Sequence, residues 1–330
     1  MITVLPRYLL KHFLGAALLA LSFFAHAQAP SAAWPSGTIR LVVPFAPGGN
    51  TDIVGRLLAD GLGKKLGVPV VVENRAGATG IIGANYVIGE PPDGYTFLLS
   101  TISITISPHI FSNVPADLVS RLAPVSQVTA VPKVLVVNPQ LPVNSVAELV
   151  AYAKKQQTPL TYGSSGIGSA HHLSGELFRT QQGIELTHVP YKGGAPALND
   201  LMGGMIHMVF DDVPPSYSFL QSGRLKALAV SSEQRSPLLP DVPTIAEAGY
   251  PGSMVEPWYG VLAPAATPRE IVAAMDKAIG EVVRGGEFHD KVVQMGGIPQ
   301  YKDTAEFTRF IASEDRKWGK VVQDAGIPRQ

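Results

Sequence analysis

The sequence predicts an α/β protein with two lobes and a ligand cleft between them. Apolar runs of strand length alternate with segments of helical spacing along most of the chain, which is typical of βαβ units with parallel strands. Several strands lead directly into Gly-rich turns, at the sheet edge where ligands collect in such folds. The two halves of the chain each hold several such units, but they are not similar in sequence and show no internal repeat.

Residues 1–27 have the pattern of a signal peptide and are not expected to belong to the fold. A basic start (Arg7, Lys11, His12) precedes an apolar run, 13–24, that is too short to span a bilayer. Small residues follow at Ala25 and Ala27, so we expect cleavage after Ala27, with Ala29 as the second choice. A short membrane anchor is the alternative.

Composition narrows the class of protein. Without Arg7 and Lys11, 24 basic residues (26 − 2) stand against 26 acidic ones, which argues against a nucleic-acid partner. The absence of cysteine excludes thiolate metal sites and cysteine nucleophiles, and about 300 residues are enough for a stable core without disulfides. Export without cysteine favours a bacterial periplasm.

The first lobe is predicted to begin with a strand, a bare turn and a helix. The β-branched run 39–43 leads through two prolines and two glycines into the apolar helical face of residues 53–66, which Asn50 or Thr51 can cap. A second strand, 70–74, is followed by the Gly-rich turn 75–80 and a helix over 81–88. A third strand covers 95–100, with Thr101 just past its end.

The second lobe repeats this arrangement. After a strand at 132–137, Ser145 and Glu148 form the capping box of a helix over 146–156. The remaining strands are expected at residues 160–162, 186–189, 207–210 and 225–230. The turns 163–169 and 190–194 each lead into a helix, and Asp211 and Asp212 follow a strand.

A strand at 258–262 and helices at 268–283 and 305–322 complete the chain. We assign residues 28–130 and 251–330 to the first lobe and 131–250 to the second. The two crossings, near 128–133 and 249–257, are candidate hinges.

The turn at 44–52 is a candidate anion seat. Glycine and proline leave its backbone bare, and the free N–H groups and dipole of the following helix favour a carboxylate. A tight turn with a capped helix and no ligand is the alternative. The turn at 163–169 offers serine hydroxyls to a carboxylate, and a capped helix start without a ligand is again the alternative. We expect such main-chain and hydroxyl donors to hold the carboxylate without a strong cation.

Other polar residues leave two interpretations open. Lys192 either pairs with a second carboxylate of the ligand or is a solvated loop lysine. Asp211 or Asp212 either accepts a hydrogen bond from the ligand or caps the helix or turn that follows. Tyr191 is a candidate to cover the ligand. Trp258 and Tyr259 are expected in core and hinge packing.

Catalytic and metal sites are not supported by the motifs. His171, His172 and Glu176 lack the H-E-x-x-H spacing and a third ligand. The turn at 163–169 matches neither a nucleophile elbow nor a phosphate-binding loop. A hydrolase would pair Ser169 with one of these histidines, but no orienting acid is marked.

Seven motifs occur in order along nearly the whole mature chain. They lie at residues 44–52, 72–75, 93–96, 162–169, 189–197, 225–230 and 239–244. In them the chain resembles the Bug-type (TctC-like) periplasmic receptors of tripartite tricarboxylate transport systems. The resemblance implies a type II periplasmic binding fold, no catalysis, no cofactor, and capture of a dicarboxylate, tricarboxylate, amino acid or aromatic acid for a membrane permease.

In that family loop backbone and ordered water hold one carboxylate, and the loops match residues 47–52, 164–169 and 191–194 here. The candidate ligand-binding residues are Pro47, Gly48, Gly49, Asn50, Thr51, Asp52, Thr101, Ser164, Ser165, Gly166, Gly168, Ser169, Tyr191, Lys192, Gly193, Gly194, Asp211 and Asp212. The turn after Arg75 and the pair Asp211-Asp212 depart from the family pattern, so the solute is not identified. We expect a monomer; a hydrolase-like enzyme and a ligand sensor for a signalling partner are the alternatives.

Overall fold

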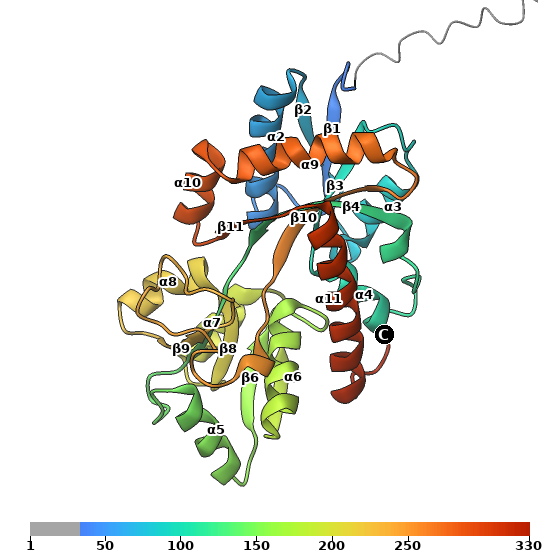
Figure 1. The fold of residues 1–330 in the computed structure, drawn as a ribbon. Helices are drawn as coiled ribbons and strands as arrows, with labels where there is room; N and C mark the ends of the chain where they lie inside the picture. The colour runs from blue at the N-terminus through green and yellow to red at the C-terminus, as the bar shows by residue number, and fades with distance from the viewer. Residues whose placement is uncertain (1–33) are drawn as a thin grey trace, which may run out of the picture. The chain divides into compact units, whose positions relative to one another are not determined.

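A six-stranded mixed sheet organises the first lobe (Figure 1). The computed structural model describes residues 34–330, so the predicted signal peptide lies outside the described residues, and all named elements lie within 37–330. The strands, in the order β11-β4-β10-β3-β1-β2, are β11 (Ile298–Lys302), β4 (Leu122–Ala130), β10 (Trp258–Pro264), β3 (Thr96–Thr101), β1 (Ile39–Val43) and β2 (Val70–Asn74).

Only part of this sheet is parallel. Strand β1 runs parallel to β2 and β3, as predicted, whereas β10 is antiparallel to β3 and β4, and β11 is antiparallel to β4. Strands β4 and β11 were not predicted, because proline and polar residues interrupt their apolar periodicity. Thr101 is the last residue of β3 and not the first residue after it.

A five-stranded sheet organises the second lobe. The strands, in the order β7-β6-β8-β5-β9, are β7 (Leu186–Pro190), β6 (Leu160–Ser164), β8 (Met208–Asp212), β5 (Lys133–Val137) and β9 (Lys226–Val230). Strand β6 is parallel to β7 and β8, but β5 is antiparallel to β8 and β9. Asp211 and Asp212 therefore belong to β8 and do not follow it.

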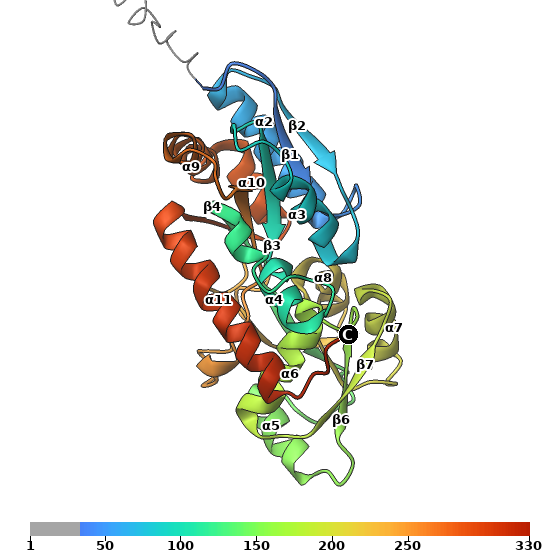
Figure 2. The same ribbon diagram turned by 90° about the vertical axis from the view of Figure 1, so that its right-hand side faces the viewer.

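Ten α-helices cover the sheets in the described residues (Figures 1 and 2). Those of the first lobe are α2 (Asn50–Leu66), α3 (Ile81–Ile88), α4 (Ser103–Ile110), α9 (Arg269–Val283), α10 (Gly286–Gln294) and α11 (Thr304–Asp324). Those of the second are α5 (Val146–Lys155), α6 (Ala170–Gln182), α7 (Gly194–Met202) and α8 (Val213–Gln221). Helices α4 and α10 were not predicted. The predicted cap by Ser145 is present, because its Oγ accepts the Glu148 N–H at 3.1 Å, but the Glu148 carboxylate accepts the N–H of Asn144 at 2.7 Å and not that of Ser145, so the reciprocal half of the capping box is displaced by one residue.

The chain passes from one sheet to the other twice. It leaves the six-stranded sheet after Ala130, enters the five-stranded sheet at Lys133 and returns between β9 and β10. We use the two sheets to define the lobes; the residues at which the lobes divide stay a prediction. No helix among residues 34–330 combines the length and apolar character needed to cross a membrane.

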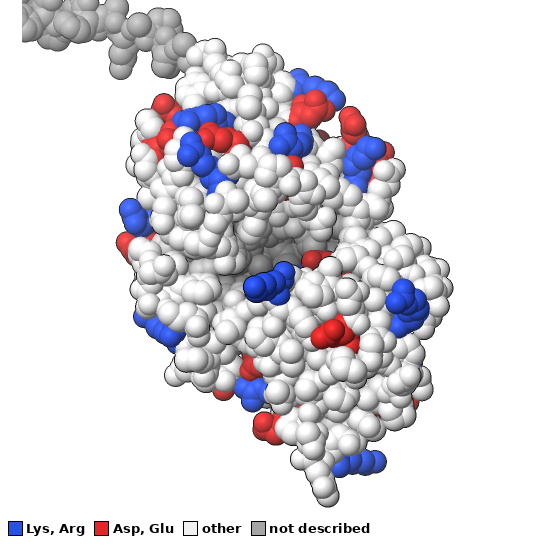
Figure 3. All heavy atoms as spheres, turned by 180° about the vertical axis from the view of Figure 1, so that it is seen from behind, with Lys and Arg blue, Asp and Glu red and all other residues white. Residues whose placement is uncertain are grey.

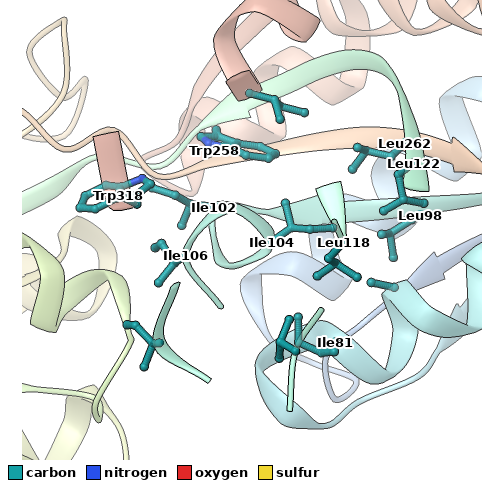
Figure 4. Packing of buried hydrophobic residues seen from close by; sticks show 14 of the residues in the cluster. Ile81, Leu98, Ile102, Ile104, Ile106, Leu118, Leu122, Trp258, Leu262 and Trp318 are labelled. Carbon is teal, nitrogen blue, oxygen red and sulfur yellow. The ribbon is translucent and has the colours of Figure 1, made fainter. Parts of the chain in front are cut away.

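A hydrophobic cluster connects the lobes on the α6–α11 side. Trp258 packs edge-on against Phe307, with ring centroids 5.3 Å apart, in the cluster shown in Figure 4. Leu173 and Leu177 of α6 are buried in the same cluster as Trp318 of α11, and the two helices lie side by side in Figures 1 and 2. This side of the interlobe space is therefore filled by side chains.

Candidate functional site

The opposite side of the interlobe space holds a cavity of about 330 Å³. Its wall comes from both lobes: Phe45, Thr51, Thr79, Thr101, Ile102, Ser103, Ile106, Val131, Lys133, Ser165, Ile167, Gly168, Ser169, Ala170, Asp212, Pro257, Trp258 and Tyr259. Seen from behind the view of Figure 1, the surface has a hollow between the lobes with mostly uncharged walls (Figure 3). A small solute with an apolar part and a few polar groups suits such a space.

Three strand ends supply the threonine hydroxyls of the first-lobe wall, and Ser103 of α4 adds another hydroxyl. Thr51 lies in the first turn of α2 after β1, Thr79 follows β2, and Thr101 ends β3. Because β1 is parallel to both neighbours, their carboxyl ends meet at one edge of the sheet. The expectation that these three loops share one edge is confirmed.

An ion-pair network braces the loop between β1 and α2. The Asp52 carboxylate accepts bonds from the Gly48 N–H at 2.9 Å, from the Arg56 guanidinium at 3.0 Å and from the Asn74 amide at 2.8 Å. Arg56 chiefly, with these other bonds, lowers the pKa of Asp52 to about 2. Asp52 is 3% exposed and is not part of the cavity wall, so its carboxylate holds the loop in shape from behind.

The expected side-chain cap of α2 does not form. Gly49 is the N-cap residue and has no side chain to cap the helix, and Asn50 and Thr51 lie within the first turn. Pro47, Gly48, Gly49 and Asn50 are exposed and do not line the cavity. Of the six residues predicted in this loop, only Thr51 faces the cavity.

The turn between β6 and α6 forms much of the second-lobe wall. Ser169 caps α6 by accepting the His172 N–H at 3.2 Å, as the capped-helix alternative predicts, and it also lines the cavity with Ser165 and Gly168. Ser164 is buried and bonds His188 Nε2 at 2.6 Å, so its hydroxyl serves the interior of the lobe. Gly166, with φ of 121°, shapes the turn without lining the cavity.

A buried cation that was not predicted lies in the same wall. Lys133 is 4% exposed, and its Nζ donates to Asp212 Oδ1 at 2.5 Å and to His171 Nε2 at 3.1 Å. Ser165 Oγ lies 2.5 Å from His171 Nδ1. This ammonium is paired within the wall by Asp212, so the expectation that the carboxylate is held without a strong cation stays a prediction. One signal in the sequence could have indicated this cluster: Lys133 lies near the start of the apolar run 132–137, and a lysine buried in such a strand needs a polar partner.

Electrostatics fix the charge states of this cluster. Burial, then the Lys133 ammonium, lowers the pKa of His171 to about 3, so its imidazole is neutral at pH 7. Burial alone would raise the pKa of Asp212, but Lys133 and His171 lower it on balance. Asp212 is therefore ionised and paired with the lysine.

Asp211 lies behind the cavity wall. Its carboxylate accepts from Ser216 Oγ at 2.7 Å and lies 3.5 Å from His171 Nε2. Burial, then the neighbouring Asp212, raises the pKa of Asp211 to about 6. No side chain caps α8, although Asp212 is its N-cap residue, so the helix-cap alternative for this pair does not apply.

The loop 191–194 does not reach the cavity. The Tyr191 hydroxyl donates to Asp200 at 2.7 Å, and Lys192 is exposed to solvent. Gly193 and Gly194 are absent from the cavity wall. A Cβ at Gly194 would lie 3.2 Å from Asp211 Oδ1, so this loop supports the buried cluster from behind.

Two aromatic residues of β10 also line the cavity. Trp258 is fully buried in the first-lobe core, as expected, but it also lines the cavity beside Tyr259 and Pro257. Burial raises the pKa of the Tyr259 hydroxyl. Both aromatic side chains were expected in packing alone, because a core aromatic and a cavity aromatic have the same sequence pattern.

The histidines considered for metal binding have other partners. His172 stacks on His188, with ring centroids 4.1 Å apart, and its Nδ1 accepts the Gly168 N–H at 3.2 Å. Glu176 accepts the Tyr162 hydroxyl at 2.5 Å and pairs with Arg179 at 2.9 Å. Within residues 34–330, no three potential metal-ligating side chains converge.

The Ser165–His171 pair resembles the nucleophile and base of a hydrolase, but the hydrogen bond between them runs in the wrong direction for a hydrolase. A general base must receive the serine proton on a free ring nitrogen. The Lys133 ammonium has only donors, so Nε2 of His171 accepts and the proton of the neutral ring lies on Nδ1, toward Ser165.

Comparisons with known proteins identify the family. The model of the tripartite tricarboxylate transporter family receptors matches residues 54–327. BugT of Bordetella pertussis is 37% identical over 89% of this chain and 90% of its own. Two structures from Rhodopseudomonas palustris cover the fold: Rpa4515 with adipate (39% identity, TM-score 0.75, 90% and 100% of the chains) and MatC with bound malate (30%, 0.71, 88% and 100%).

The family and these relatives are solute-binding receptors and not enzymes, which confirms the predicted class and its α/β binding fold. The chain belongs to the tripartite tricarboxylate transporter receptor family.

Proposed function

We propose that the chain captures a small organic carboxylate in the interlobe cavity and presents it to the permease subunits of a tripartite tricarboxylate-type transporter. The observation that carries the proposal is a cavity lined by hydroxyls of both lobes, in a family of solute receptors. Adipate in Rpa4515 and malate in MatC support a carboxylate as the solute class. A dicarboxylate, tricarboxylate, amino acid or aromatic acid remains the predicted range.

The cavity offers enough donors to offset the loss of carboxylate hydration. That loss is several kcal/mol, and a hydrogen bond to a charged group returns about 1.5–3 kcal/mol. Thr51, Thr101 and Ser103 from one lobe and Ser165 from the other line the cavity with hydroxyls, whereas the Ser169 hydroxyl donates to the Gly166 carbonyl at 2.7 Å. Micromolar affinity needs about 8 kcal/mol in total, and apolar contacts with Ile102, Ile106 and Trp258 can contribute the rest.

We place this function in the periplasm, after export and cleavage behind Ala27. The membership of the receptor family and the signal pattern of residues 1–27 support that location. We propose that the receptor is a monomer whose lobes close on the solute, so that the permease recognises the closed population.

A thermal-shift screen of the mature chain tests the binding function. Adipate, malate, tricarboxylates, amino acids and aromatic acids are added in turn, and at least one acid is expected to raise the Tm. Thr101→Val, which removes a cavity hydroxyl at nearly constant shape, should reduce that shift. Thr308→Val on α11 is the matched control, because its hydroxyl bonds the Thr304 carbonyl away from the cavity. No shift with any acid would contradict the proposal.

A further inference from the structure

The buried cluster of Lys133, His171 and Ser165 has a defined direction. An ammonium group only donates, so the Lys133–His171 contact of 3.1 Å makes Nε2 the acceptor. A neutral imidazole carries one N–H, which must then be on Nδ1, 2.5 Å from Ser165 Oγ. Ser165 Oγ therefore accepts from His171, and its own proton is free to point toward another acceptor.

The cavity supplies the place for that acceptor. Ser165 lines the cavity, and two of the three N–H groups of the Lys133 ammonium in the same wall are taken by Asp212 at 2.5 Å and His171 at 3.1 Å. Asp212 also neutralises the charge of the lysine, so the pair adds polarity to the wall without adding net charge. A chain of hydrogen bonds polarises each member, so a cation at one end makes the last hydroxyl a stronger donor.

We propose that Lys133, His171 and Ser165 form a directional hydrogen-bond chain that dedicates the Ser165 hydroxyl as a donor to an anionic oxygen of the ligand. This inference rests on the proposed function and deepens it: a carboxylate oxygen, and not an ammonium or amide N–H of the solute, sits against Ser165. Lys133 and His171 act as positioning residues, because both work through the serine.

The tautomer of His171 tests the chain in the absence of any ligand. Long-range ¹H–¹⁵N spectra of the ¹⁵N-histidine-labelled mature protein, with the signal assigned by His171→Gln, should show a neutral ring protonated at Nδ1 from pH 5 to pH 8. A ring protonated at Nε2, or a charged ring at pH 7, would overturn the proposal.

A double-mutant cycle tests the link to the ligand. The probe is whichever acid of the thermal-shift panel, adipate and malate included, stabilises the wild type, and its Kd is measured by calorimetry. Ser165→Ala should weaken binding about 10- to 100-fold, as expected for loss of one bond to a charged group. His171→Gln should weaken binding in the presence of Ser165 but add less than about 2-fold in the Ser165→Ala background. Losses that multiply independently would overturn the chain.

His289→Gln is the matched control, because His289 is a half-exposed residue of α10 away from the cavity; its Kd should stay at the wild-type value. The two proposals fail in different ways. If no acid of the panel binds the wild type, the proposed function fails and the ligand role of Ser165 with it, whereas the histidine spectra still decide the direction of the chain. If an acid binds and the tautomer or the cycle disagrees, only the chain is overturned.

Discussion

The two walls of the cavity handle charge in opposite ways. In the first lobe, the charged Asp52–Arg56 pair lies behind the loop, and the wall itself presents threonine hydroxyls. In the second lobe, the ion pair between Lys133 and Asp212 forms part of the wall. One lobe uses an ion pair to shape a neutral surface, and the other places an ion pair in contact with the solute space.

The difference has an energetic consequence. Arg56 is 55% exposed, so solvent screens its attraction for Asp52, whereas the side chain of Lys133 is 5% exposed. A buried pair contributes little net stability compared with an apolar replacement, but removal of one partner leaves a charge uncompensated. We therefore expect the second-lobe wall to be far more sensitive to single substitutions than the first.

Removal of the buried cation should have the largest effect. Lys133→Met leaves Asp212 ionised beside Asp211 without its partner, and we expect a loss of about 3–5 kcal/mol in the free energy of unfolding at pH 7. Urea unfolding followed by circular dichroism measures the loss. The double variant Lys133→Met/Asp212→Asn should recover most of it, because no charge is left unpaired. Equal instability of both variants would contradict the ion-pair explanation.

Asp211 should respond in the opposite direction. Its pKa of about 6 lies above the ordinary value, so its ionisation between pH 4 and pH 6 opposes folding. The groups facing it are Asp212, Lys133, His171 and Ser216. Asp211→Asn should therefore stabilise the protein by about 2 kcal/mol at pH 7.5, from two pKa units at 1.4 kcal/mol each with allowance for coupling.

The gain from Asp211→Asn should disappear near pH 3, below the ordinary aspartate pKa, where the wild-type carboxyl is largely protonated in both the folded and the unfolded state. Urea titrations of both proteins at pH 3 and pH 7.5 test this. A gain of the same size at the two pH values would mean that packing, and not ionisation, is responsible.

The sequence predicted the strand-to-helix turns because glycine, proline and capping residues act locally. It did not predict the Lys133 cluster, since the cross-strand pairing of β5 and β8 places Lys133 opposite Asp212, 79 residues away. Strands β4 and β11 were not predicted for a related reason: they are strands because they pair with neighbouring strands, and their own apolar periodicity does not mark them. The fold class therefore followed from local signals, whereas the charged half of the cavity depends on tertiary pairing.

The first-lobe brace should produce a smaller effect. Asp52→Asn removes the charge that Arg56 and the Gly48 N–H stabilise, and we expect a loss of about 1–1.5 kcal/mol at pH 7, reduced by the exposure of Arg56. Because the folded pKa of about 2 lies below the ordinary value, this stability is present above pH 4 and is lost as the pH falls toward 2. The difference between wild type and variant in urea should shrink over that range; a constant difference would contradict it.

The smallest change in stability should come from Ile167, at the tip of the second-lobe turn. Its side chain lines the cavity and is 44% exposed, and a Cβ at the adjacent Gly168 would lie 3.4 Å from Ile110 and Phe111 of the first lobe. If the lobes close on the solute, this apolar surface is buried in the bound state only. Ile167→Ser should then leave the free energy of unfolding within about 0.5 kcal/mol of wild type and weaken binding of a panel acid about 3- to 10-fold, as loss of roughly 1 kcal/mol of apolar burial implies.

Met205→Ser, at the 71% exposed turn after α7, is the control and should change neither quantity. Unchanged affinity in Ile167→Ser would mean that the turn does not close over the solute.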